Sequence, residues 1–215
     1  MSFEVAKRES VPLMISLSGS SGSGKTYSAL HMAAGIAGEG GKVGLVDTEA
    51  GRGSMYADDQ DIVDVMPGGQ YYVQRLTEPF SPAKYAQAIK SAIKAGITAV
   101  IIDSASHEWE GFGGCQDIAE NNKLRGMPNW TKAKMEHKRL MNFITQCPIH
   151  VIFCLRAREY SEYRLNSGYN SGNNLRPWIA KPILIDISSR EATESGVMCG
   201  GCRVRRCRSC ASCAR

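Results

Sequence analysis

The segment of the sequence most clearly built for chemistry is a glycine-rich loop near the N-terminus. Residues 19–26 read GSSGSGKT and match the pattern G-x-x-x-x-G-K-[ST] in full. An apolar run at Leu13–Ser18 precedes the loop and a helical pattern at Lys25–Ala37 follows it, which is the strand–loop–helix context in which this pattern binds phosphate. The residues that we predict to hold ATP are Gly19, Ser20, Ser21, Gly22, Ser23, Gly24, Lys25 and Thr26.

Each part of this loop has a chemical task. Glycines let backbone N–H groups converge on phosphate oxygens, and the start of the following helix adds the positive end of its dipole. We predict that Lys25 contacts the β- and γ-phosphates as a catalytic residue and that the Thr26 hydroxyl binds Mg²⁺. The alternative, a chance turn rich in glycine and serine, is disfavoured by the flanking strand and helix.

A second Mg²⁺ ligand is predicted where another apolar run ends. Residues 98–103 read TAVIID, so Asp103 comes directly after a strand that is apolar throughout. A carboxylate at the C-terminal edge of a parallel sheet can hold Mg²⁺ through water, as the Walker B aspartate does. The alternative is an aspartate that only caps the following loop, and we favour the metal role.

Hydrolysis needs a group that orients and deprotonates water. Glu49 lies just past the apolar run Val43–Asp47, at the same predicted sheet edge, and we predict that it is the catalytic base. Glu108 and Glu110 follow the strand that ends at Asp103 and are the competing candidates.

Two arginines follow a further apolar strand. Arg156 and Arg158 come after Ile149–Leu155, a strand expected between the glycine-loop strand and the Asp103 strand. An arginine at this tip can sense the γ-phosphate or stabilise charge in the transition state, and we predict Arg156 as a catalytic residue. The alternative is a solvated surface arginine.

The elements that must position these residues alternate along the chain. Apolar runs and helical patterns take turns, which predicts right-handed crossovers and an α/β fold with a mostly parallel sheet and helices on both faces. Residues 106–130 read as a long loop with a partial helix. The predicted strands are 13–18, 43–47, 62–66, 98–103 and 149–155, and the predicted helices are 25–37, 82–95 and 131–146.

Composition narrows the class of protein. The chain has 215 residues, of which 43% are hydrophobic and 22% charged, as in ordinary globular proteins. It has no apolar run that would span a bilayer and no secretory signal at its start, so we expect a cytoplasmic protein without membrane contact. Residues 177–215 carry a net charge of +4 out of a total of +5, so the charge is weak evidence for a basic groove on the main domain.

Cysteine is concentrated in the same C-terminal region. Five of the eight cysteines fall in the last 17 residues, whereas Cys147 and Cys154 lie by or in an apolar strand and are expected to be reduced and buried. The CxxC pairs of the tail are only four residues apart, which disfavours a packed zinc knuckle. We predict an N-terminal extension at 1–11, an ATPase core at 12–178 and an irregular tail at 179–215 that is disordered or non-native.

Four segments resemble those of phage and prophage AAA-type ATPases, which are RecA-like P-loop proteins, some of them grouped with single-strand-annealing recombinases. The resemblance covers about residues 12–165. It implies ATP and Mg²⁺ as cofactors, a catalytic glutamate at Glu49, and for Arg52 either a structural role or one between subunits. The chain departs from the family pattern after about Trp178, where Pro182–Ile187 can still supply a short strand. The segments are DTEAGRGSMYAD (47–58), EPFSPAKYAQAIKSA (78–92), IIDSASHEWEGFGG (101–114) and HVIFCLRAREY (150–160).

Two functions remain open at this point. The first is a RecA-like phage ATPase that forms a homo-oligomer on single-stranded DNA during recombination, annealing or replication, in the cytoplasm of a bacterial host. The second is a nucleotide-dependent switch that recruits a protein partner and hydrolyses ATP slowly. A small-molecule kinase is a weaker option because no lid with clustered arginines is found. A ParA-like ATPase would carry a lysine where Ser20 and Ser21 stand.

Overall fold

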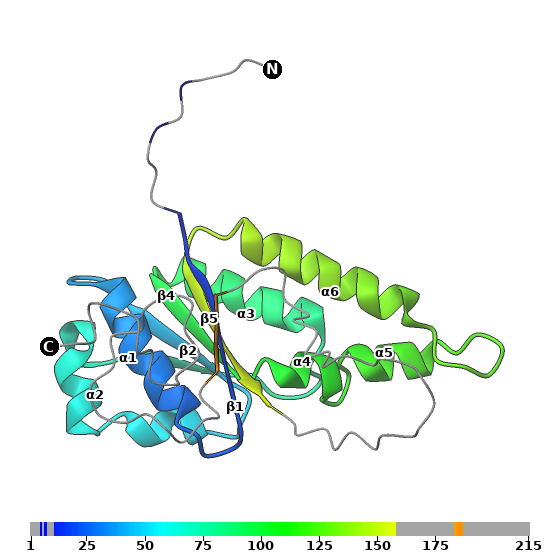
Figure 1. Cartoon of the computed structure of the whole chain (residues 1–215), viewed down its shortest axis with the longest axis horizontal. Coiled ribbons are helices and arrows are strands. Elements are labelled where there is room, and N and C mark those ends of the chain that lie inside the picture. Colours follow the sequence, from blue (N-terminus) through cyan, green and yellow to red (C-terminus); the bar gives the residue numbers. More distant parts are fainter. Residues whose placement is uncertain (1–4, 6, 8–10, 158–182, 187–215) are drawn as a thin grey trace, which may run out of the picture.

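The core of the protein is a parallel sheet of six strands. The structure, a computed structural model, describes residues 5, 7, 11–157 and 183–186, the last four by their backbone only. The strand order is β3-β2-β4-β5-β1-β6, and every pair is parallel. The strands are β1 Met14–Gly19, β2 Val43–Asp47, β3 Tyr72–Arg75, β4 Ala99–Asp103, β5 His150–Arg156 and β6 Ile183–Asp186 (Figure 1).

Helices cover both faces of this sheet, as the alternating pattern predicts. On one face α1 (Lys25–Ala37) packs on β1, β2, β4 and β5, and α2 (Gln60–Val65) packs on α1. On the other face α3 (Pro82–Lys94) and α6 (Trp130–Thr145) form a second core with the same central strands (Figure 1). All five residues of β2 and of β4 are buried, which explains why these strands read as continuous apolar runs. The α/β fold with a RecA-like parallel sheet is therefore confirmed.

The predicted strand at Ile62–Met66 is wrong. These residues belong mainly to α2, whose first turn is capped by the Asp59 side chain as it accepts a hydrogen bond from Asp61 N. Ile62 is buried against α1, so the apolar residues mark one side of a short helix rather than a strand. The sheet's edge strand is instead β3, and its four residues are all exposed, so it has no apolar run to reveal it.

The segment expected to be mostly loop contains two short helices. They are α4 (Ser106–Glu110) and α5 (Cys115–Asn121), and α5 packs along α6. A small separate core forms there around Cys115, Ala119 and Ala133. Short 3₁₀ turns occur at η1 (Arg52–Tyr56) and η2 (Pro67–Gly69).

Several predictions concern residues that the structure does not describe. Arg158 and the Cys-rich tail lie outside the described residues. The strand considered at Pro182–Ile187 is present as β6, which pairs with β1. Within residues 11–157, no helix is long and apolar enough to cross a membrane.

Candidate functional site

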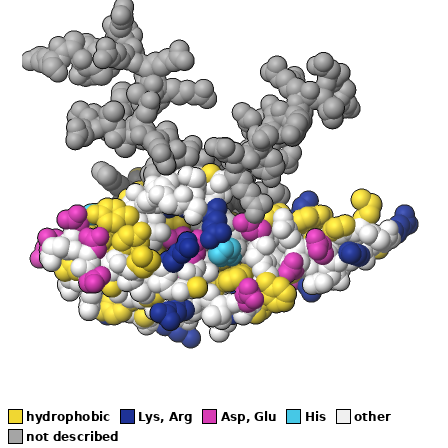
Figure 2. Space-filling model, turned by 90° about the horizontal axis from the view of Figure 1, so that it is seen from below, with side chains coloured by type: hydrophobic (Ala, Val, Ile, Leu, Met, Phe, Trp, Pro, Cys, Tyr) yellow, Lys and Arg dark blue, Asp and Glu magenta, His cyan; other side chains and the backbone are white. Residues whose placement is uncertain are grey.

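The candidate site lies at the C-terminal edge of the sheet, where the strand register brings the predicted residues Gly19, Arg156 and Asp103 close together. Gly19 pairs with Arg156 across β1 and β5, and Asp47 pairs with Asp103 across β2 and β4. Because the strands are parallel, their carboxyl ends share one edge. Viewed from this edge, basic, acidic and histidine side chains gather near the middle of the face (Figure 2).

The glycine loop leaves the first turn of α1 open. Gly22 and Gly24 adopt left-handed backbone angles, with φ of 79° and 84°, which favour glycine at both positions. Gly24 is the N-cap of α1. Because glycine has no side chain, nothing at this position accepts hydrogen bonds from the start of the helix. The backbone N–H groups of that first turn therefore face the loop without a competing side-chain acceptor, as an anion site requires.

Lys25 is folded back over this loop. Its side-chain nitrogen donates hydrogen bonds to the carbonyl oxygens of Gly19 (3.1 Å) and Ser20 (2.7 Å), and the residue is only 8% exposed. The positive charge is thus held inside the concavity that the loop forms.

Thr26 and Asp103 meet across the gap between α1 and β4. The Thr26 hydroxyl donates a hydrogen bond to Asp103 Oδ2. Burial raises the pKa of the Asp103 carboxyl, the bond from Thr26 opposes this rise, and repulsion from Glu49 adds to it. A hydroxyl and a carboxylate in contact are hard oxygen donors of the kind that Mg²⁺ takes, so these two residues fit the predicted metal.

Glu49 is held between two arginines. Arg156 donates to Glu49 Oε1 from both Nη2 (2.6 Å) and Nε (3.1 Å), and Arg52 Nη1 lies 3.6 Å from Oε2. The Glu49 side chain is 17% exposed. The turn behind it is fixed by Asp47, whose carboxylate accepts from the backbone nitrogens of Glu49 and Gly53.

A hydrogen-bonded network that the sequence reading missed joins the ends of β2 and β4. Thr48 Oγ1 lies 2.8 Å from His107 Nδ1 and accepts a bond from the Ser104 nitrogen. Tyr85 on α3 donates its hydroxyl to the Ser104 carbonyl. Burial, followed by the positive charge of Arg156, lowers the pKa of His107. In the sequence, this network is visible only as polar residues directly after each strand. The sequence does not show which of these residues bond to one another.

The two competing glutamates do not face the glycine loop. Glu108 is buried, and its carboxylate contacts His137 Nδ1 at 3.0 and 3.1 Å and Cys115 Sγ at 3.4 Å. Neither Glu108 nor Glu110 lines the cavity beside the loop.

That cavity has a volume of about 190 Å³ and brings most of the predicted site residues together. Gly19, Ser20 and Ser23 do not line it, although the first two hold Lys25 through their carbonyls. Its wall also includes the η1 turn, which the sequence reading had not assigned to nucleotide binding. The lining residues are Ser21, Gly22, Gly24, Lys25, Thr26, Glu49, Arg52, Met55, Tyr56, Asp103 and Arg156.

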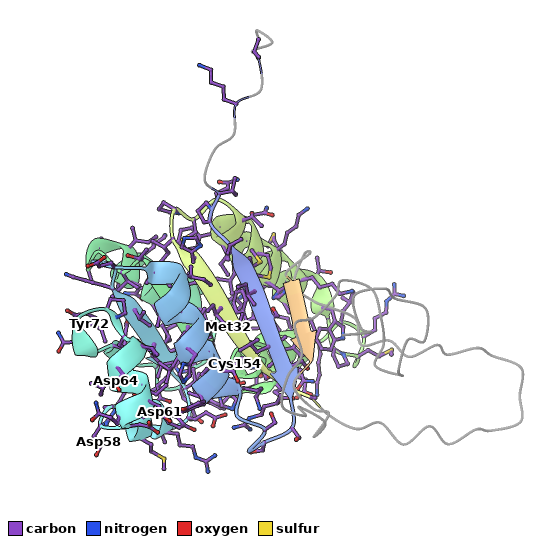
Figure 3. The ribbon with its side chains drawn as sticks, turned by 60° about the vertical axis from the view of Figure 1, so that its left-hand side comes forward. Met32, Asp58, Asp61, Asp64, Tyr72 and Cys154 are labelled. Carbon is purple, nitrogen blue, oxygen red and sulfur yellow. The ribbon has the colours of Figure 1, made fainter. Side chains whose placement is uncertain are left out.

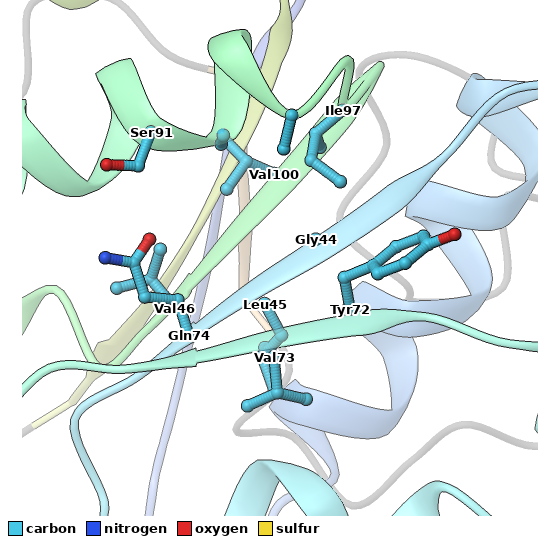
Figure 4. Close-up of a pocket in the computed structure, with 11 residues that line it drawn as sticks. Gly44, Leu45, Val46, Tyr72, Val73, Gln74, Ser91, Ile97 and Val100 are labelled. Carbon is cyan, nitrogen blue, oxygen red and sulfur yellow. The ribbon is translucent and has the colours of Figure 1, made fainter.

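A second cavity of about 270 Å³ lies elsewhere, between the β3 edge of the sheet and α3. Figure 4 shows its apolar side chains, among them Val46, Val73 and Val100. It contains none of the predicted site residues and only uncharged ones, so phosphate chemistry belongs to the first cavity.

Comparison with known families agrees with this geometry. A family model described as an AAA domain matches residues 12–171 of the chain. No curated protein matches the chain.

Proposed function

The chain belongs to the AAA-domain family, and from that premise we propose that it binds ATP with Mg²⁺ in the 190 Å³ cavity and hydrolyses the ATP. The AAA domain itself indicates a nucleotide-binding ATPase. The observation that carries the proposal is the meeting of the phosphate loop, the Thr26–Asp103 pair and the Glu49–Arg156 pair on one cavity. These are the three parts that phosphoryl transfer to water requires.

Binding of the phosphates begins with Lys25 and the open start of α1. The loop carbonyls that now accept from Lys25 are weaker partners than phosphate oxygens, because charge-assisted bonds between ions are stronger than bonds to neutral carbonyls. Lys25 therefore turns to the β- and γ-phosphates. The backbone N–H groups of the loop and of the first turn of α1 bind the remaining phosphate oxygens.

Thr26 and Asp103 hold the metal ion. A Mg²⁺ ion held there would supply positive charge that neutralises the charge developing on the phosphates. Thr26 supplies its hydroxyl oxygen directly, and Asp103 accepts hydrogen bonds from the water that surrounds the ion. The buried carboxylate of Asp103, whose pKa is raised by desolvation and only partly lowered by Thr26 and Lys25, would gain a stronger positive partner in the ion.

Glu49 and Arg156 carry the chemical step. Glu49 acts as the base that takes a proton from the attacking water, and Arg156 stabilises charge on the γ-phosphate. Arg156 donates two hydrogen bonds to Glu49, so while this ion pair is formed neither side chain is available for its catalytic role. The γ-phosphate competes for the guanidinium and thereby frees the carboxylate for catalysis.

The η1 turn offers a surface for the base of the nucleotide. Tyr56 and Met55 line the cavity together with Arg52, which belongs to the same turn. An aromatic ring and a thioether are both suited to stacking against a purine. Tyr56 is itself supported by an edge contact with Tyr27, at 5.8 Å between ring centroids.

The wider role that we propose is in DNA recombination, annealing or replication of a phage, with ATP hydrolysis coupled to assembly on single-stranded DNA. The support is the resemblance of the chain to RecA-like phage ATPases, together with a site that is open at its rim, where the Arg52 side chain is 69% exposed. An exposed arginine at the rim can reach a nucleotide on a neighbouring copy.

One observation favours a second function. The Glu49 carboxylate is already paired with Arg156, so turnover requires that this ion pair opens first. A slow opening step gives a nucleotide-dependent switch that holds ATP for long enough to recruit a protein partner.

The catalytic assignment is tested by separating binding from turnover. Glu49→Gln keeps the side-chain shape but cannot take the proton, so turnover should fall by about 10²-fold or more while ATP and Mg²⁺ still bind. Glu108→Gln is the matched control, because Glu108 faces away from the cavity. Steady-state phosphate release measures both variants. Loss of turnover in Glu108→Gln with normal turnover in Glu49→Gln would refute the assignment.

A further inference from the structure

A second set of side chains with metal-binding chemistry lies outside the nucleotide cavity. Glu108 on α4, Cys115 at the start of α5 and His137 on α6 each offer one ligand atom, and these atoms all lie within 4.8 Å of one another. None of the three residues lines the cavity beside the glycine loop. Side chains from three separate helices therefore meet in one cluster. The proposed hydrolysis of ATP does not use this cluster.

The distances within this cluster suit a tetrahedral ion. His137 Nδ1 lies 3.0 Å from Glu108 Oε1, and Cys115 Sγ lies 3.4 Å from the same oxygen. Ligand atoms around a tetrahedral zinc ion are separated by about 3.3–3.6 Å, given bonds of roughly 2.0–2.3 Å to nitrogen, oxygen and sulfur. The two contacts with Glu108 are therefore within a few tenths of an ångström of the spacing that zinc needs, and the ligand atoms of Cys115 and His137 lie within 4.8 Å of each other.

The ligand types select the metal. A thiolate and an imidazole are soft or borderline donors that favour Zn²⁺, whereas Mg²⁺ and Ca²⁺ prefer sites made wholly of oxygen. The carboxylate of Glu108 and the thiolate of Cys115 together carry two negative charges. They balance the charge of Zn²⁺, which lowers the cost of placing the ion in a buried site.

The cluster is largely buried, with aromatic rings on one side and the charge of Glu136 acting on Cys115. Cys115 is fully buried and Glu108 is 6% exposed. The indole of Trp109 stacks on that of Trp130 at 5.5 Å and meets His137 edge-on at 5.6 Å between ring centroids. Such a shell keeps bulk water away and strengthens the interaction between an ion and its ligands.

We propose that Glu108, Cys115 and His137 bind a zinc ion, with water in the fourth position. On binding, the Cys115 thiol releases its proton to solvent and the thiolate bonds to the metal. The ion ties α4, which follows the strand of Asp103, to α5 and α6. It acts as a structural cross-link for a region that has only a small core of its own.

The test needs a chain in which the cluster is the main zinc ligand. The five tail cysteines are therefore replaced by serine in the full-length protein (Cys199, Cys202, Cys207, Cys210 and Cys213). This protein, after exposure to zinc and gel filtration, should retain about one zinc per chain by mass spectrometry of the metal, as expected for a stoichiometric site. Cys115→Ser in the same background should lose it. Cys147→Ser is the matched control, because Cys147 is also buried but lies outside the cluster, and it should keep the zinc.

Cobalt(II) gives a second, spectroscopic readout of the same cluster. Co²⁺ added to the metal-free, tail-serine protein should produce a thiolate-to-cobalt charge-transfer band, which zinc displaces and which His137→Gln weakens. Absence of both zinc and this band in the tail-serine protein would overturn the proposal. Retention of zinc by Cys115→Ser would overturn it as well. Neither measurement depends on ATP, so the metal site and the nucleotide site stand or fall separately.

Discussion

The site residues at the sheet edge form hydrogen bonds with one another, and a bound ligand can replace these internal partners. Lys25 donates to loop carbonyls, Thr26 donates to Asp103, and Arg156 donates to Glu49. Each of these bonds satisfies a polar group that would otherwise be costly to bury. In the account proposed here, phosphate, Mg²⁺ and water replace these internal partners one for one, so the site can bind its ligands without rebuilding the fold.

Asp103 shows the conflict between stability and function at this scale. Its pKa is raised, so between the unfolded pKa and the native pKa the folded state holds more protons than the unfolded state. Stability therefore falls as the pH rises through that window, and the whole penalty is present once the pH is above the native pKa. A buried carboxylate that destabilises the metal-free protein is consistent with a group retained for its ligand.

This reasoning predicts opposite effects of one substitution. Asp103→Asn removes the buried charge, so the metal-free protein should become more stable at pH 7, with a Tm about 2–4 °C higher for each kcal/mol regained. The affinity for ATP in the presence of Mg²⁺ should fall. Differential scanning calorimetry in chelator and ATP titration with Mg²⁺ measure the two effects. A lower Tm together with unchanged Mg²⁺-dependent affinity would contradict the role given to Asp103.

The acidic and arginine residues predicted from the sequence share one property, since each lies at or just after the end of an apolar strand. Parallel strands bring such positions to a common edge, which is why Asp103, Glu49 and Arg156 could be named before any contact was known. The pairing of Thr48 with His107 could not be predicted, because these residues are 59 positions apart and their contact depends on the register of β2 and β4.

At the scale of elements, α2 and β3 show where hydrophobic patterns fail. The apolar residues around Ile62 are too few to separate a short helix from a short strand. The edge strand β3 has exposed residues only, so it shows no hydrophobic pattern. It is recognised as a strand by its pairing with β2. The central strands and the long helices were predicted closely. The strands are apolar throughout because they are buried, and each helix has apolar residues along the side that faces the core.

The helical assignment of α2 predicts an asymmetric stability effect. Ile62 is 1% exposed, so Ile62→Ala should lower the free energy of unfolding by about 2–5 kcal/mol. Val65, on the same helix, is 44% exposed, and Val65→Ala should change it by no more than about 0.5 kcal/mol. Urea denaturation measures both. Equal, large losses in the two variants would mean that Val65 is buried and that the segment packs differently.

At the scale of the whole molecule, the charge is unevenly placed. The acidic side chains Asp58, Asp61 and Asp64 lie on or next to α2, at the outer side of the molecule (Figure 3). Residues 1–176 carry a net charge of only +1, the total of +5 less the +4 of residues 177–215. A DNA contact made by the core would therefore be a local patch away from α2 rather than a basic face.

The proposed coupling to DNA predicts ATP-dependent assembly. Single-stranded DNA should raise the rate of ATP hydrolysis, and ATP should favour an oligomer because Arg52 at the open rim can act on a neighbouring copy. Binding should weaken with salt over only a few phosphates, with a slope of about −0.7 per phosphate. Anisotropy of a labelled oligonucleotide with ATP, with ADP and without nucleotide, together with light scattering, measures these effects. Negligible DNA binding in all three states and a monomer in ATP would leave the switch as the function.

The central claim, that the glycine-loop cavity holds ATP, is tested most directly by calorimetric titration of ATP and Mg²⁺ into Lys25→Ala. The substitution removes a charge-assisted contact worth about 1.5–3 kcal/mol, so ATP affinity should fall at least tenfold while the fold is retained. Lys94→Ala is the matched control, because Lys94 is exposed at the end of α3, and its affinity should equal that of the wild type. Wild-type affinity in Lys25→Ala would contradict the account.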